Sequence, residues 1–114
     1  SNWTHTSSGN IKTARIRFGT GNNTSGTQLR GLALSASLTY SDLTAIGNIT
    51  ASTQTSTFSD GAPGGISTAG AATTTSSIDT TGATYVVLSG ALASTGETVT
   101  LIGYSAILYR PDIT

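Results

Sequence analysis

Apolar and polar side chains alternate in short runs along the chain, which is the spacing of β-strands that bury one face. Residues 10–18 place three apolar side chains on one face, namely Ala14, Ile16 and Phe18. The opposite face of that run carries Thr13, Arg15 and Arg17. Residues 28–40 repeat the pattern, with Leu32, Leu34, Ala36, Leu38 and Tyr40 on one face. The pattern predicts two strands, joined by a Gly- and Asn-rich loop at residues 19–26.

The largest concentration of bulky side chains lies near the C-terminus. Residues 85–92 and 99–109 are both rich in β-branched and aromatic side chains, and a turn at residues 93–97 contains Gly96. The two runs therefore predict a pair of strands. Both faces of each run carry bulk, so we expect both faces to be covered, in a sandwich or at an oligomer interface.

The remaining segments give weaker signals. Residues 43–58 form a poor strand pattern, anchored by Ile46 and Ile49 among Thr, Ser and Gln. Residues 59–82 are rich in Ser and Thr, and we expect a long surface loop or a poorly packed edge segment. No apolar set repeats at helical spacing for three turns. The sequence predicts a single all-β domain over residues 1–114, built as an antiparallel β-sandwich.

Composition narrows the class of partner. Charged residues make up 9% of the chain and the net charge is zero, so we expect no nucleic acid or anionic membrane surface as a partner. Cysteine is absent, which excludes a disulfide framework and a thiolate metal site. No apolar run is long enough to span a membrane. We expect no cofactor and no bound metal.

The large apolar side chains are few for a domain of this length. Ile, Leu, Val and Phe together make up roughly a fifth of the chain, close to the fraction below which chains are disordered. Alternating clusters and zero net charge argue for folding, but a lone copy would bury little apolar surface. Burial against identical copies would supply the missing area, so we expect a homo-oligomer.

Both ends of the chain resemble bacteriophage structural proteins. At the N-terminal end, Trp3-Thr4-His5-Thr6 precedes an alternating strand, residues 10–19, that ends in glycine. At the other end, Asp79-Thr80-Thr81 leads into a strand ending Leu88-Ser89-Gly90, and Glu97-Thr98 precedes the run Val99-Thr100-Leu101-Ile102. These patterns are similar to the C-terminal modules of tail fibres and tailspikes.

The resemblance implies a jelly-roll-like, trimeric module of the virion that contacts other virion proteins. It carries no shared catalytic residues, and we expect a non-enzymatic protein that trimerises and binds a host-surface glycan. Two alternatives stay open. One is a capsid decoration protein on the head surface, and the other is a fragment of a carbohydrate-active enzyme.

Few residues suggest chemistry. The one histidine, His5, has no partner in sequence, and we expect a hydrogen-bonded surface residue in preference to a catalytic base or a metal ligand. Asp60 and Asp79 would be the paired acids of a glycosidase only if folding brought them together. The isolated acids form no calcium-binding loop.

Two groups of residues are candidates for binding. The expected glycan-contacting residues carry guanidinium, amide, carboxylate or aromatic groups: Arg15, Arg17, Asn22, Asn23, Asp60 and Tyr104. Lys12 belongs to the same basic stretch of sequence as the two arginines. The expected oligomer interface consists of apolar residues from the last strand: Val99, Leu101, Ile107 and Tyr109.

Overall fold

A computed structural model describes residues 1–34, 39–59 and 74–108 of the chain. Within these ranges all regular secondary structure is β-strand, with no helix, and every pair of neighbouring strands is antiparallel. The strands are β1 (Asn2–His5), β2 (Lys12–Gly19), β3 (Thr27–Leu34), β4 (Thr39–Ser41), β5 (Leu43–Thr50), β6 (Thr53–Ser59), β7 (Thr74–Ser76), β8 (Tyr85–Leu92) and β9 (Val99–Gly103). The predicted all-β, antiparallel class is confirmed, and the described part contains no helix long and apolar enough to cross a membrane.

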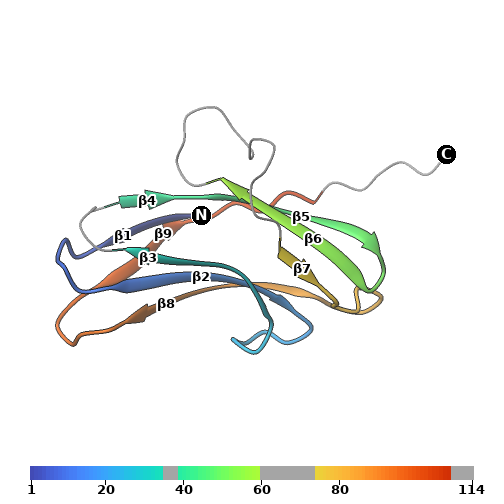
Figure 1. Cartoon of the computed structure of the whole chain (residues 1–114), viewed down its shortest axis with the longest axis horizontal. Coiled ribbons are helices and arrows are strands. Elements are labelled where there is room, and N and C mark those ends of the chain that lie inside the picture. The colour runs from blue at the N-terminus through green and yellow to red at the C-terminus, as the bar shows by residue number, and fades with distance from the viewer. Residues whose placement is uncertain (35–38, 60–73, 109–114) are drawn as a thin grey trace.

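The strands form three sheets, ordered β4-β1-β9, β3-β2-β8 and β5-β6-β7. The first two sheets make the two layers at one end of the molecule, and β5 and β6 continue the β4 layer toward the other end (Figure 1). β8 pairs with β2, whereas β9 pairs with β1, so the turn between β8 and β9 carries the chain from one layer to the other. The arrangement is consistent with a β-sandwich.

The core between the two layers centres on Trp3. Its indole is buried with Ala14 and Leu34, and Leu88, Val99 and Leu101 pack against this cluster from β8 and β9. A Cβ on Gly90 would lie 2.7 Å from a methyl carbon of Val99 and 3.6 Å from the Trp3 ring. Gly90 therefore leaves the space that the indole and Val99 occupy. Ile16, Phe18 and Leu29 are buried further along the β3-β2-β8 sheet.

A buried glutamine organises the β5-β6-β7 sheet. The Gln54 side chain is fully buried, and its Oε1 accepts hydrogen bonds from Ser76 Oγ and from the backbone N–H of Ile78, each at 3.0 Å. Its Nε2 donates to the carbonyl of Ile78 at 2.8 Å. The side-chain amide of Gln54 thus bonds to both the N–H and the C=O of Ile78, as the backbone of a neighbouring strand would. These bonds satisfy the buried amide.

The sequence patterns gave strand faces more accurately than strand partners. The inward set Ala14, Ile16 and Phe18 is buried as predicted. The runs 85–92 and 99–109 do contain strands, but these lie in different sheets and β9 ends at Gly103. The expected single strand over residues 28–40 is two strands in different sheets, because β4 pairs with β1.

Two further expectations concern the middle of the chain. Residues 43–58 form most of a hairpin, β5 and β6, but Ile49 is not an anchor, since it is exposed on β5 beside the hairpin turn. The expected loop over residues 59–82 contains the short strand β7, and its residues 60–73 lie outside the described ranges.

Candidate functional site

Two arginines lie side by side on the outer face of the β3-β2-β8 sheet. Arg15 and Arg17 occupy alternate positions of the central strand β2, facing away from the buried Ala14 and Ile16. Strand register places Ser89 opposite Arg15 on β8, so Tyr85 and Val87 share the same outer face. On the other side, β3 places Gln28 opposite Arg17. We call the surface formed by Arg15, Arg17, Gln28, Tyr85 and Ser89 the arginine face.

Hydrogen bonds hold one of these arginines in place. Arg17 donates to Ser89 Oγ from Nη1 and to Gln28 Oε1 from Nη2, each at 3.3 Å. Gln28 reaches Arg17 by lying over Gly31, since a Cβ on Gly31 would come within 2.6 Å of Gln28 Nε2. The absence of a side chain at Gly31 therefore leaves the space that the Gln28 amide occupies beside the guanidinium.

No described acid neutralises the arginine face. Asp42 forms an ion pair with the Ser1 amino group at 3.1 Å, and Glu97 lies 3.5 Å from Lys12. The third described acid, Asp79, accepts hydrogen bonds from the Thr81 backbone N–H and hydroxyl in a tight turn. Within the described ranges Arg17 thus donates only to neutral oxygens, and neither arginine of the face forms an ion pair.

The structure brings together only some of the residues predicted to contact glycan. Asn22 and Asn23 are exposed in the loop that follows β2, on the same hairpin as the two arginines. Asn23 Oδ1 accepts a hydrogen bond from the Ser25 backbone N–H at 2.9 Å, which fixes its orientation within the loop. Tyr104 follows β9, in the other layer, and Asp60 lies outside the described residues.

Large apolar side chains are exposed at the end of β9. Ile102, Tyr104 and Ile107 are 62%, 70% and 72% exposed, and we call them the C-terminal apolar surface. Of the residues predicted to form an oligomer interface, Val99 and Leu101 face inward and pack on the Trp3 cluster. Ile107 belongs to the exposed set, and Tyr109 lies outside the described residues. The interface itself stays a prediction.

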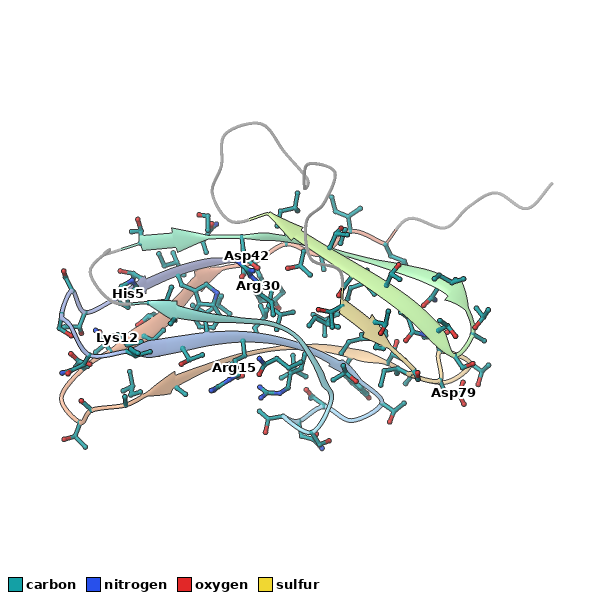
Figure 2. The ribbon with its side chains drawn as sticks, viewed as in Figure 1. His5, Lys12, Arg15, Arg30, Asp42 and Asp79 are labelled. Carbon is teal, nitrogen blue, oxygen red and sulfur yellow. The ribbon has the colours of Figure 1, made fainter. Side chains whose placement is uncertain are left out.

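A second polar cluster is buried where β2 begins. Lys12 is fully buried, and its Nζ donates to Ser8 Oγ at 2.7 Å and to the carbonyl of Asn10 at 2.8 Å. Glu97, from the turn between β8 and β9, accepts from the Ser8 hydroxyl and from Asn10 Nδ2. The cluster connects the segment between β1 and β2 with the turn between β8 and β9 through hydrogen bonds. It lies at the end of the molecule where Lys12 is labelled in Figure 2.

One expectation from the sequence is wrong at this end. His5 is buried, not at the surface, because it lies on the inward face of β1 in line with Trp3. Its Nδ1 donates a hydrogen bond to the carbonyl of Thr6 at 3.1 Å, and the buried Nε2 has no hydrogen-bond partner among the described residues. Lys12 does not join the two arginines, because alternation along β2 turns it toward the core.

Sequence reasoning missed the cluster of Ser8, Asn10, Lys12 and Glu97. One signal was available, because Lys12 lies in phase with Ala14, Ile16 and Phe18 and so belongs to the inward face. Nothing in the pattern indicated Glu97 as its partner, since 85 positions along the chain separate the two residues. The described residues hold no group of three or more side chains suited to a metal ion.

Hydrogen bonds lower the pKa of two carboxyl groups. The Ser8 hydroxyl is the main cause that holds the pKa of Glu97 below its ordinary value of 4.5; partial desolvation opposes the shift, and Asn10 and Lys12 reinforce it. The hydroxyl and then the backbone N–H of Thr81 lower the pKa of Asp79 below its ordinary value of 3.8. Both groups are therefore more acidic in the folded chain than in the unfolded chain.

These shifts predict the direction of acid sensitivity. A carboxyl group with a lowered folded-state pKa stabilises the fold fully above its unfolded pKa, and the contribution is lost as the pH falls through the folded value. We expect the free energy of unfolding to fall with acidification below about pH 5. In the double variant E97Q/D79N the free energy of unfolding should depend less on pH across the same window. Urea denaturation at a series of pH values would measure this dependence. An unchanged pH dependence in this variant would contradict the assignment.

Comparison with known proteins adds no relative to this picture. No protein-family model matches the chain, and comparisons with curated proteins and with solved structures give no match. The residues of the arginine face and of the C-terminal apolar surface are therefore the observations on which a functional conclusion can be based.

Proposed function

We propose that the chain is a non-enzymatic structural component of a bacteriophage particle, a jelly-roll-like module that trimerises on a tail fibre or tailspike and binds a host glycan. The observation that carries the assembly part of the proposal is the imbalance of apolar burial. Six hydrophobic residues are buried in the described part of the chain, whereas ten large hydrophobic side chains are exposed. Exposed apolar side chains that lie close together are typical of a protein–protein contact, and three of the ten, Ile102, Tyr104 and Ile107, lie within six positions of the chain.

The C-terminal apolar surface is the part best suited to contact another copy. Val99 and Leu101 use the inward face of β9 for the intrachain core, which leaves Ile102 on the outward face. Tyr104 and Ile107 follow directly, and both are mostly exposed. Three copies that pack these residues around a common axis would remove them from water without disturbing the core of any copy.

The arginine face supports the second half of the proposal. It presents guanidinium, amide, hydroxyl and aromatic groups together on one side of a sheet, and such groups bind sugars through hydrogen bonds and ring contacts. It lies on the β3-β2-β8 sheet, whereas the C-terminal apolar surface continues β9 of the other layer. Assembly and glycan binding can therefore use different surfaces.

Mass measurement in solution tests the assembly. We expect the wild-type protein to have three times the mass of one chain. The variant Ile102→Asp should have the mass of one chain, because burying an unpaired carboxylate at the interface is costly. Ser52→Asp places the same charge at the exposed turn between β5 and β6 and should leave the mass unchanged. A wild-type protein that stays monomeric at all concentrations would overturn the assembly proposal.

The two alternative functions have no observation in their favour within the described residues. A carbohydrate-active enzyme would need Asp79 beside a second acid, but Asp79 accepts its hydrogen bonds from Thr81 and Asp60 lies outside the described ranges. Capsid decoration would use the same exposed surfaces as a fibre module, and the two differ only in the partner within the particle.

A further inference from the structure

The arginine face has a feature that neutral sugars would not require. Two of the five basic residues of the chain lie on one face, at alternate positions of one strand, and no described acid pairs with them. Alternate residues of a strand are roughly 6–7 Å apart, so two guanidinium groups can reach a single anionic substituent. In a chain of zero net charge this face carries a local excess of two positive charges.

The neighbouring residues leave Arg15 uncovered and hold Arg17 in place through neutral oxygens. Ser89 and Gly31 are small residues opposite Arg15 on its two neighbouring strands, so neither side chain covers it. Gln28, which lies over Gly31, and Ser89 each accept from Arg17 and leave their remaining polar groups available. Figure 2 shows Arg15 near the middle of β2, away from the buried cluster at Lys12.

An aromatic side chain borders the arginines on the same face. Tyr85 is 39% exposed and lies opposite Gly19, which has no side chain to cover it. A half-exposed tyrosine ring offers an apolar surface with a hydroxyl at its rim, which suits the faces and hydroxyl groups of a sugar ring. Tyr85, Arg17 and Arg15 follow one another along the face. A sugar ring on Tyr85 would therefore lie at one end of the face, and an acidic substituent of the saccharide would lie beside the two arginines.

We infer that the arginine face binds an acidic saccharide, with Arg15 and Arg17 pairing with a carboxylate or sulfate group and Tyr85 packing against a sugar ring. This inference rests on the proposed glycan-binding function and narrows its ligand. Guanidinium groups match carboxylates and sulfates because their N–H groups form paired, charge-assisted hydrogen bonds. Nucleic acid fits less well, because its affinity comes from many phosphate contacts and this face carries two cations.

Titration of the full chain with defined saccharides tests the inference. The probes are a hyaluronan hexasaccharide, which carries carboxylates, a chondroitin 4-sulfate hexasaccharide, which adds sulfates, neutral chitohexaose and inorganic sulfate. Calorimetry should detect binding of one or both acidic hexasaccharides, weaker binding at higher salt, and at least about tenfold weaker binding of chitohexaose and inorganic sulfate. The two acidic probes distinguish a carboxylate ligand from a sulfate ligand.

Variants locate the site. We expect Arg15→Ala/Arg17→Ala to weaken binding of the acidic hexasaccharide by about tenfold or more, and Arg15→Lys/Arg17→Lys to weaken it less, because lysine keeps the charge but loses the paired donors. Tyr85→Ala should also weaken it, whereas Thr100→Ala, exposed on β9 of the other layer, serves as the control with unchanged binding. Unfolding curves and mass measurements on each variant check that fold and assembly are intact.

The outcomes separate the inference from the proposed function. Equal binding of neutral and acidic hexasaccharides, no binding of either acidic probe, or wild-type affinity in the double alanine variant would each overturn the inference. A change in assembly mass in that variant would also overturn it, because the face would then be an interface between copies. If the wild type forms trimers and binds only chitohexaose, the proposed function stands without the inference. A monomer that binds no saccharide would overturn both.

Discussion

Replacement of Trp3 by alanine is expected to lower the free energy of unfolding by about 3–5 kcal/mol. The indole is 4% exposed and is the largest member of the cluster that joins the two layers. The β3-β2-β8 layer and β9 both contact it, so its loss would leave a cavity that neither layer can fill alone. In a domain of ordinary marginal stability this loss would leave much of the protein unfolded, which urea denaturation would measure.

Two further variants make the Trp3 result interpretable. Trp3→Phe keeps a large ring and loses the hydrogen bond from Nε1 to Ser1 Oγ at 3.0 Å, so its cost should be smaller than that of alanine. Ile49→Ala, at a mostly exposed position on β5, should change stability by less than about 0.5 kcal/mol. Equal effects of Trp3→Ala and Ile49→Ala would show that the indole does not hold the layers together.

Lys12→Met is expected to lower the free energy of unfolding by about 2–4 kcal/mol, because it removes a buried ammonium from its hydrogen bonds. The substitution keeps a long apolar stem in the same space and deletes only the charged donor. Ser8 Oγ, the carbonyl of Asn10 and Glu97 would each lose a partner at once. Urea denaturation of the variant near neutral pH would measure the loss.

A double-mutant cycle separates the ion pair from the hydrogen bonds. Lys12→Met/Glu97→Gln should be less destabilised than the sum of its single variants, because the carboxylate that loses its cation is then absent. Arg15→Met is the matched control, since it removes a basic residue from the opposite face of the same strand and should change stability little. A loss in Arg15→Met as large as that in Lys12→Met would contradict the buried role of Lys12.

The sequence predicted strand faces well where apolar residues alternate without interruption. The faces of β2 follow directly from Ala14, Ile16 and Phe18, because a period of two leaves only one inward set. The same alternation places Lys12 on the inward face of β2, whereas His5 lies in a segment for which the sequence pattern predicts no strand. The partners of Lys12 are Ser8, in the segment before β2, and Glu97, in the turn between β8 and β9, and a local pattern does not show that this turn lies beside Lys12.

Strand partners were harder to predict than strands. The runs that became β8 and β9 are adjacent in sequence and have a turn between them, which is the signature of a hairpin. They lie in different sheets because each pairs with an early strand, β8 with β2 and β9 with β1. A pattern of alternation states which side chains face inward but carries no information about which distant strand lies alongside.

The arginine face was predictable in part for the same reason. Alternation alone placed Arg15 and Arg17 together, since they are two positions apart on one strand. Tyr85, Gln28 and Ser89 could not be added from the sequence, because they join the face only through the register of β8 and β3. Tyr104 was grouped with the arginines for its chemistry, and the structure places it after β9.

The pairing of early strands with late ones has a consequence for synthesis. While the chain grows, β1 and β2 leave the ribosome long before residues 85–103, which supply their partners β8 and β9. Until then β2 has only β3 beside it, and its other edge presents unpaired N–H and C=O groups that other nascent chains can join. Closing such distant contacts is slow, so the yield of native protein should depend on how long this edge stays open in the cell.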